Sequence, residues 1–364
     1  MKVATIIGAR PQFIKSALVS KALRKAGHQE FLIHTGQHYD YEMSQVFFDE
    51  LAIPEPDVNI GIGSGSHGRQ TGEMLTRIEE MLTAEEPDLV LVYGDTNSTL
   101  AGALAACKMH IPLAHVEAGL RSFNRHMPEE HNRVLTDHCS DLLLCPTQTA
   151  VDNLSREGFD QGVCLVGDTM YDAVLHFAAI AHEQSQIIQD LRLEPRGYLL
   201  ATIHRPYNTD IPENLRNILT AFSEIGEPIV FPVHPRTQKK IAELNGTCNV
   251  ERDMRNVKII DPVGYLDMLV IERNARAILT DSGGIQKEAY FFGVPCITLR
   301  PETEWIETLD GGWNVVVGSN RSLIVQEASK MKASQTRRGA FGDGHAVENI
   351  LHKLENFILE RSST

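Results

Sequence analysis

Short apolar runs alternate with amphipathic stretches along nearly the whole chain. In the first half, apolar runs predict strands at Val3–Ile7, Glu30–His34, Asp88–Tyr93, Leu113–Val116, Asp141–Cys145 and Gly162–Val166. Helical patterns lie between these strands, near Phe13–Ala26, Ser98–Lys108 and Thr147–Glu157. This βαβ alternation predicts an α/β fold built on a parallel, doubly wound sheet.

The same alternation restarts after Arg196. Strands are predicted at Tyr198–Thr202, Pro228–Val233, Val257–Ile260, Ala277–Thr280 and Pro295–Thr298, with a helix near Pro212–Ile225. A helical segment, Asp172–Leu193, connects the halves, and the tail His345–Ile358 has helical spacing. A chain of 364 residues can form two domains with separate cores. We expect an N-terminal Rossmann-like domain of residues 1–170 plus the C-terminal helix 345–364, and a C-terminal one of residues 171–344.

Two turns carry the signs of a phosphate site. Gly8–Lys15 and Asp281–Glu288 each follow a predicted strand and open a helix. Ligands of parallel sheets collect beyond the carboxyl ends of strands, where helix N-termini offer unpaired N–H groups. One such turn in each half suggests a ligand held between two nucleotide-binding domains. We expect its phosphates to contact Arg10, Lys15 and the turn Ser282–Gly284, although solvated surface charges are the simpler explanation of the basic pair.

Three carboxylates are predicted at the ligand edge of the first domain. Asp95 and Glu117 each follow a predicted strand, and Glu129 lies in the first turn of a helix that begins at Pro128. Helix capping or favourable interaction with the helix dipole could account for each acid separately. Acids gathered at one edge raise one another's pKa and so permit proton transfer near neutral pH. We therefore expect at least two of them to be catalytic.

The second half places two histidines at successive strand ends. His204 is followed by Arg205, and His234 ends the next predicted strand. A lone histidine is often a structural hydrogen-bonding residue, but two at one edge favour contact with a ligand. In the Asp281–Glu288 turn, Glu288 could accept hydrogen bonds from two ribose hydroxyls. The run Gly63–Gly68 matches G-x-G-x-x-G, but it follows a poor strand, so it predicts a loop and not a dinucleotide site.

Composition excludes several classes of function. The net charge of −14 argues against nucleic-acid or anionic-membrane partners. Six cysteines without C-x-x-C spacing indicate buried thiols in a reducing compartment. No apolar run reaches membrane-spanning length, and the N-terminus lacks a signal-peptide pattern. We expect a cytoplasmic protein without a cofactor, and no bound metal, because no metal-ligand spacing is found.

Taken together, the motifs resemble one family, the non-hydrolysing UDP-N-acetylglucosamine 2-epimerases. The resemblance runs through Gly8–Lys15, Thr35–Asp40, Tyr93–Thr99, His115–Ser122, Pro128–Asp137, His204–Arg205, Asp281–Glu288 and Thr303–Glu304. It implies a GT-B fold with the active site between its two domains, and a homodimer. It also implies inversion at C2 of a UDP-sugar through loss of UDP and a 2-acetamidoglycal, for cell-surface polysaccharides such as the lipopolysaccharide O antigen.

Roles follow from the resemblance by motif position. The implied catalytic residues are Asp95, Glu117, Glu129 and His204. Substrate contacts are expected from Arg205 and, by the resemblance, from Arg10, Lys15, His234, Tyr265, Ser282, Gly283, Gly284 and Glu288. Some members bind a second UDP-sugar as an activator, with residues that resemble Gln37, His38, Arg69 and Gln70.

Departures from the common pattern leave the substrate open. Gln12 and Lys287 stand where the common enzymes have acids, and Trp305 stands where they have an arginine. This set resembles a subgroup acting on UDP-2,3-diacetamido-2,3-dideoxy-glucuronate, since Gln12 and Lys287 would repel the extra carboxylate less. UDP-N-acetylglucosamine and the diacetamido-uronate are therefore rival substrates. A GT-B glycosyltransferase and, from the glycine-rich loop alone, an NAD-dependent oxidoreductase are the other enzyme classes considered.

Overall fold

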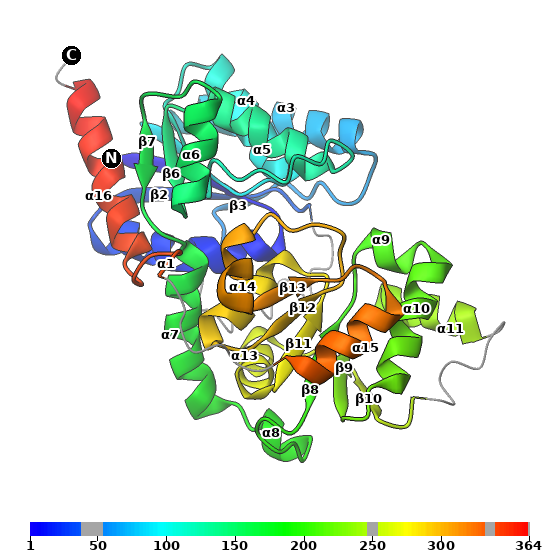
Figure 1. Ribbon diagram of the computed structural model, residues 1–364. Helices are drawn as coiled ribbons and strands as arrows, with labels where there is room; N and C mark the ends of the chain where they lie inside the picture. Colours follow the sequence, from blue (N-terminus) through cyan, green and yellow to red (C-terminus); the bar gives the residue numbers. More distant parts are fainter. Residues whose placement is uncertain (38–53, 246–253, 332–338, 363–364) are drawn as a thin grey trace. The chain divides into compact units, whose positions relative to one another are not determined.

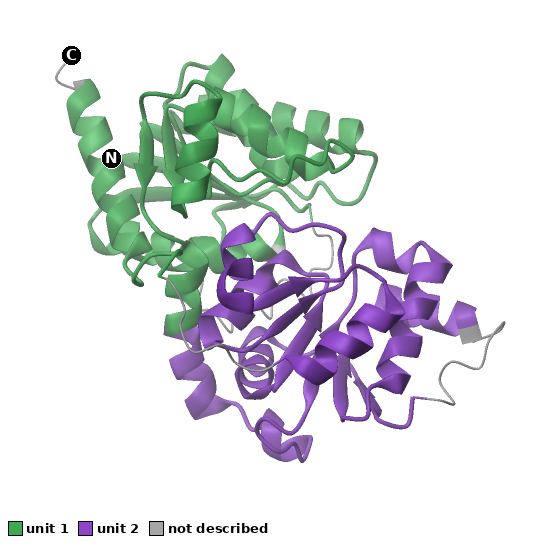
Figure 2. Cartoon of the chain, in the orientation of Figure 1, with its two compact units in different colours: residues 1–175, 339–364 green, residues 176–338 purple. Residues whose placement is uncertain are grey.

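The computed structural model describes residues 1–37, 54–245, 254–331 and 339–362, without the side chains of Arg10, Asn245 and Ser362. The chain forms two compact units (Figure 2). Unit 1 comprises Met1–Leu175 and Gly339–Thr364, and unit 2 comprises His176–Arg338. The boundaries expected from the sequence lie at 170/171 and 344/345, whereas the two units meet at 175/176 and 338/339.

Unit 1 contains a parallel sheet in the order β3-β2-β1-β4-β5-β6-β7. Its strands are β1 (Lys2–Ile7), β2 (Gln29–His34), β3 (Val58–Asn59), β4 (Leu89–Tyr93), β5 (Leu113–Val116), β6 (Leu142–Cys145) and β7 (Val163–Leu165). Its helices are α1 (Arg10–Lys25), α3 (His67–Glu85), α4 (Asn97–Lys108), α5 (Pro128–Cys139), α6 (Gln148–Arg156) and α16 (Ala346–Ser362), while α7 (Thr169–Gln184) crosses into unit 2.

Both faces of this sheet are covered, which explains why its central strands are mostly apolar. Helices α3, α4 and α5 lie side by side (Figure 1), and Met74 and Ile78 of α3 pack with Ile6 and Val92 of the central strands. On the other face lies α1, and the C-terminal helix α16 packs against it. All strands run in one direction, so the residues that follow β1, β4 and β5 lie at one edge.

Unit 2 repeats this architecture with the strand order β10-β9-β8-β11-β12-β13, again parallel. Its strands are β8 (Leu199–Thr202), β9 (Ile229–Pro232), β10 (Val257–Ile260), β11 (Ala277–Thr280), β12 (Cys296–Thr298) and β13 (Asn314–Val316). Its helices are α8 (Ile187–Asp190), α9 (Pro206–Thr209), α10 (Pro212–Glu224), α11 (Pro235–Asn245), α13 (Tyr265–Asn274), α14 (Gly283–Phe292), the 3-10 helix η1 (Ile306–Gly312) and α15 (Arg321–Lys330). Residues of α10, α11 and α15 share one core, and residues of α13 and α14 share the other.

The predicted α/β fold with doubly wound parallel sheets is confirmed, with three differences. The short strands β3 and β13 are not predicted from the sequence, because two or three residues carry too little pattern. The expected connector Asp172–Leu193 is two helices, α7 and α8, separated by a break. The expectation of buried thiols is wrong for Cys107, which is exposed.

Candidate active site

Hydrogen bonds of Gln12 hold the first predicted phosphate-binding turn, which follows β1, in shape. Its side-chain oxygen accepts hydrogen bonds from the backbone N–H groups of Gly8 (2.8 Å) and Ala9 (3.0 Å). Its amide nitrogen donates to the carbonyl of Tyr93 (2.8 Å) and the hydroxyl of Thr99 (3.0 Å). The side chain is buried and joins the turn after β1 to the end of β4. Gln12 is thus a structural residue of the turn, which corrects the expectation that it faces the ligand's charge.

Glu117, a predicted catalytic acid, is held in an unusual backbone conformation. It follows β5 with φ of 71°, in the left-handed region that is costly for a residue with a side chain. Its carboxylate forms an ion pair with Lys15 of α1. Gly94, with φ of 62°, leaves the necessary space, since a Cβ there would lie 3.3 Å from the Glu117 carboxylate. Strain of this kind is typical of functional sites.

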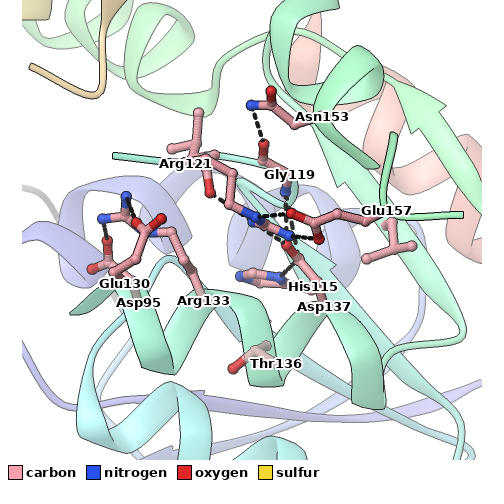
Figure 3. Close-up of polar contacts among 12 residues, drawn as sticks. Asp95, His115, Gly119, Arg121, Glu130, Arg133, Thr136, Asp137, Asn153 and Glu157 are labelled. Atoms are coloured by element: carbon pink, nitrogen blue, oxygen red, sulfur yellow. Dashed lines mark hydrogen bonds and ion pairs between the residues drawn. The ribbon is translucent and has the colours of Figure 1, made fainter. Parts of the chain in front are cut away.

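Asp95 lies in the turn between β4 and α4 and pairs with Arg133 of α5 at 2.5 Å (Figure 3). The same guanidinium contacts Glu130 at 3.0 Å. Glu130 is buried and accepts hydrogen bonds from Ser122, so it is a structural acid. Glu129, the third predicted acid, lies at the N-terminal end of α5, partly exposed. Glu117 and Asp95 therefore have basic partners, Lys15 and Arg133, that the sequence motifs alone do not reveal.

A buried charge network supports the backbone around Glu117 (Figure 3). The His115 ring contacts the Asp137 carboxylate and the Gly94 carbonyl, both at 2.7 Å. Arg121 contacts Asp137 at 2.7 Å and Glu157 at 2.6 Å. Burial raises the pKa of Asp137, but the hydrogen bonds and charges of His115 and Arg121 outweigh it, and the net pKa is lowered. An ionised carboxylate and a carbonyl only accept hydrogen bonds, so each ring nitrogen of His115 lies opposite an acceptor.

In unit 2, Asp281 organises the loop that carries the predicted catalytic His204. Asp281 follows β11 and is fully buried. Its carboxylate accepts hydrogen bonds from the backbone N–H groups of His204 (3.1 Å) and Arg205 (3.0 Å), and it lies 3.4 Å from Nδ1 of His204. The pairing of β8 with β11 brings these strand ends together. His234, which follows β9, is exposed at the same edge of this sheet, and its Nδ1 accepts a hydrogen bond from the N–H of Arg236.

The second predicted phosphate-binding turn, which follows β11, is a capped helix N-terminus. Ser282 caps α14, and its hydroxyl accepts from the N–H of Ile285 at 3.5 Å. The next residues, Gly283 and Gly284, begin the helix, whose first N–H groups have no intrahelical acceptor. A Cβ at Gly283 would lie 2.5 Å from the Glu304 carboxylate, so a larger residue does not fit. Helix start, cap and glycines agree with the predicted phosphate contact.

The side chain of Lys287 is buried and does not face solvent. Its side chain is 1% exposed and its ammonium lies 3.9 Å from the centre of the Trp305 ring. Lys287 and Trp305, two of the three departures from the common family pattern, thus form one cation–π contact. The expectation that a partly exposed Lys287 eases repulsion of an extra substrate carboxylate loses its basis, because the lysine is buried.

Glu288 of α14 lies among ionisable groups of unit 2. Tyr265, at the start of α13, and Glu272, further along that helix, are ionisable neighbours of its carboxyl. Burial raises the pKa of Glu288 to about 7, against the opposing effects of Tyr265, Lys287 and Glu272. Among the described residues, Oε1 of Glu288 is buried without a hydrogen-bond partner. A ligand hydroxyl could satisfy that oxygen.

The predicted activator residues are only partly gathered. Gln37 accepts hydrogen bonds from Ser98 at the start of α4, and Gln70 accepts one from Asn97 there at 2.8 Å. Arg69 instead is exposed and pairs with Glu73 at 2.7 Å. His38 lies outside the described residues, as does the side chain of Arg10.

Unit 1 also has an open pocket of about 610 Å³. It lies between the N-terminal ends of α3, α4 and α5, where its lining includes His67, Asn97 and His131. In the part of the chain that the structure describes, no group of three or more His, Cys, Asp or Glu residues could hold a metal ion. Among the described helices, none is long and apolar enough to span a membrane.

The fold and these strand-end residues define a GT-B type protein with two Rossmann-like units. The sequence profile described as UDP-N-acetylglucosamine 2-epimerase matches residues 21–355. The chain belongs to the UDP-N-acetylglucosamine 2-epimerase family, as the sequence motifs predict.

Asp137, Arg133, Asp281 and Glu272 are not among the predicted site residues. Only parallel strand register could have pointed to Asp281, as the partner of the His204 loop.

Individual relatives match over nearly the full length. A "UDP-N-acetylglucosamine 2-epimerase homolog" of Methanococcus maripaludis is 56% identical over 98% of this chain and 100% of its own. The UDP-2,3-diacetamido-2,3-dideoxy-D-glucuronate 2-epimerase of Pseudomonas aeruginosa is 49% identical over 97% of this chain and 99% of its own. The crystal structure of Methanocaldococcus jannaschii UDP-GlcNAc 2-epimerase in complex with UDP-GlcNAc and UDP has a TM-score of 0.90 and 45% identity, covering 98% and 100% of the two chains.

Proposed function

We propose that this protein is a UDP-N-acetylhexosamine 2-epimerase, an isomerase that inverts C2 of its sugar nucleotide. The observation that carries the proposal is the full-length similarity to relatives named as UDP-sugar 2-epimerases. The strained, buried and ion-paired Glu117 agrees with it, because a proton-transfer site needs a fixed carboxylate.

The acids of unit 1 serve the proton transfers. A C2 proton beside an N-acetyl group is weakly acidic, so its removal is coupled to departure of UDP from C1. The proton goes to a carboxylate, the C1–O bond breaks, and the new C1–C2 double bond gives a 2-acetamidoglycal. UDP then adds back to C1 while a proton reaches the other face of C2. Asp95, Glu117, Glu129 and His204 are the candidates for these transfers, with Lys15 and Arg133 holding two of the acids.

Unit 2 supplies most of the nucleotide contacts. The α14 N-terminus with Ser282, Gly283 and Gly284 suits a diphosphate. The unpartnered Oε1 of Glu288 suits a ribose hydroxyl. The remaining contacts are assigned to Arg10, Lys15, Arg205, His234 and Tyr265. We expect turnover without added metal or cofactor, because basic groups and a helix N-terminus meet the phosphate charge; loss of turnover in a chelator, restored by a divalent ion, would contradict this.

The substrate is UDP-N-acetylglucosamine or its diacetamido-uronate relative. The first is favoured by the TM-score of 0.90 to an enzyme in complex with UDP-GlcNAc and UDP, and the second by the 49% identity to the diacetamido-uronate enzyme. Since Gln12 and Lys287 are both buried, neither supports the uronate through contact with its carboxylate. Comparing kcat/KM for the two purified substrates decides between them.

The decisive experiment follows C2 in deuterated water. With UDP-N-acetylglucosamine or the diacetamido-uronate and no acceptor, proton NMR should show deuterium at C2 and the manno epimer. Sugar transfer to an acceptor without exchange at C2 would instead indicate a glycosyltransferase. The proposal further includes a homodimer and an activator site near Gln37 and Gln70. It also includes a location in the cytoplasm and a role in polysaccharide synthesis. Light scattering and the response of the rate to added UDP-N-acetylglucosamine test the first two.

A further inference from the structure

Glu272 is a buried acid that no step of the proposed reaction uses. It lies on α13 and is fully buried. Its carboxyl faces that of Glu288 on the neighbouring helix α14. Among the described residues, neither Glu272 oxygen has a hydrogen-bond partner of good geometry. A carboxylate buried without a compensating partner is very costly, so such a group takes up a proton instead.

The surroundings of Glu272 support this conclusion. Burial raises its pKa well above the ordinary value, and the negative charge of Glu288 raises it further. Other ionisable groups around the pair are Tyr265 of α13, Lys287 of α14, Tyr198 before β8 and Cys296 of β12. Burial raises the pKa values of Tyr265, Tyr198 and Cys296, so these three are neutral near pH 7. Lys287 is the cation of this set, and its charge lowers the pKa of Glu288.

A protonated carboxyl has one O–H donor, and an ionised carboxylate only accepts. Glu272 can therefore donate its hydrogen bond to Glu288, on which the hydroxyl of Tyr265 also acts. Two donors from α13 would fix the Glu288 carboxylate from one side. Its unpartnered Oε1 would then be presented to a ligand in one orientation.

We infer that Glu272 is a positioning residue, a neutral carboxylic acid that holds the Glu288 carboxylate in place to accept hydrogen bonds from the vicinal hydroxyls of a ribose. The inference rests on the proposed function, because it takes the ligand of Glu288 to be a nucleotide. The acid pair carries one proton while Glu288 is ionised. A second proton, taken up as the pH falls through about 7, removes the acceptor charge and weakens the hydroxyl contacts.

The test is binding of UDP and 2′-deoxy-UDP to the full-length protein between pH 5.5 and 8. The deoxy nucleotide lacks one of the two hydroxyls but titrates similarly at its phosphates. The ratio of the two dissociation constants therefore isolates the ribose contact. For the unaltered protein this ratio should be largest above pH 7 and fall by up to ~10-fold per pH unit below it.

Two variants separate positioning from packing. Glu272→Gln keeps an N–H donor toward Glu288 but cannot take up a proton. Because Glu272 is already neutral in the unaltered protein, this variant should bind UDP like it at pH 8 and show the same pH dependence, since the proton taken up near pH 7 goes to Glu288. Glu272→Leu keeps the volume and loses the donor, and it should lose most of the preference for UDP over 2′-deoxy-UDP at every pH. Asp267→Asn, on the same helix but bonded to Ser185, is the control and should change neither quantity.

Thermal unfolding identifies variants that fail to fold; if Glu272→Leu is one of them, loss of the ribose preference in Glu272→Gln at pH 8 still overturns the inference. If Glu272→Gln loses the ribose preference at pH 8, or if folded Glu272→Leu keeps it, the positioning role is wrong. If the unaltered protein binds neither nucleotide, or binds both equally at every pH, the proposed nucleotide site fails and this inference fails with it. Ribose preference in the unaltered protein without any effect of Glu272 overturns only the inference.

Discussion

Each unit contains a fully buried acid, Asp137 in unit 1 and Glu272 in unit 2, and the pKa values of the two are shifted in opposite directions. Asp137 contacts the His115 ring and the Arg121 guanidinium, and its pKa is lowered despite burial. Glu272 faces another acid, Glu288, and its pKa is raised. Depth is the same in both cases, so the partner decides whether a buried carboxyl is ionised.

This difference also separates two uses of buried charge. The Asp137 network is balanced and joins β5, the segment after it, α5 and α6, next to the strained Glu117. It supports backbone positions. The Glu272–Glu288 pair has two acids near one buried cation, Lys287, and ends in an unpartnered oxygen. An unbalanced pair of this kind is poised to respond to a ligand or to pH.

The largest expected effect is on catalysis, for which acids of unit 1 are the proposed proton-transfer groups. Glu117→Gln removes the charge that pairs with Lys15 and a proton-transfer group, so kcat should fall by ~10²–10⁴. UDP affinity should change little. Asp95→Asn should behave in the same way. Glu79→Gln, on the exposed side of α3, is the control. Steady-state kinetics with isothermal titration of UDP measures both quantities, and near-normal turnover would rule out the assigned roles.

Stability should distinguish the two buried acids next. Asp137→Asn leaves the buried charge of Arg121 poorly compensated and removes the carboxylate that contacts His115, which should cost about 3–5 kcal/mol in the free energy of unfolding. Glu272→Gln replaces a neutral acid by a neutral amide, so the change should be much smaller or favourable. Urea unfolding of both variants at pH 7 measures the contrast. Equal losses would mean that the two acids are not in opposite charge states.

The sequence predicts the strands and the residues at their ends better than it predicts the partners of those residues. Apolar runs at β4, β5, β8 and β11 identify buried parallel strands. The strands of one parallel sheet end at one edge, so Glu117 can be expected at that edge of unit 1 and His204 at that edge of unit 2. The partners cannot, because Asp137 and Arg133 approach from α5 and their contacts depend on how the helix packs on the sheet. Gln12 and Lys287 show the opposite failure, since their positions in motifs suggested ligand contacts but their side chains are buried in structural contacts.

The pH dependence of stability should have opposite signs in the two regions. The pKa of Glu288 is raised in the folded state to about 7, so its contribution is fully present below the ordinary value of 4.5 and is lost as the pH rises through about 7. The loss should be about 1–3 kcal/mol without ligand. The pKa of Asp137 is lowered, so its contribution is present above 3.8 and is lost as the pH falls below that value. Urea unfolding from pH 4 to 8 tests the signs; in Glu288→Gln the loss near pH 7 should vanish, and its persistence would assign it to another group.

The smallest expected effect lies at the outer end of the Asp137 network. Glu157 pairs with Arg121 at 2.6 Å, but its side chain is 30% exposed, so water partly replaces the contact. Glu157→Gln should therefore cost only ~1 kcal/mol in the free energy of unfolding, because Asp137 still neutralises the buried guanidinium. The double variant with Asp137→Asn should lose more than the sum of the two single losses, since Arg121 then has neither acid. A loss in Glu157→Gln as large as that in Asp137→Asn would show that the partly exposed Glu157 neutralises Arg121 as effectively as the buried Asp137 does. Burial would then not explain which of the two acids stabilises the fold more.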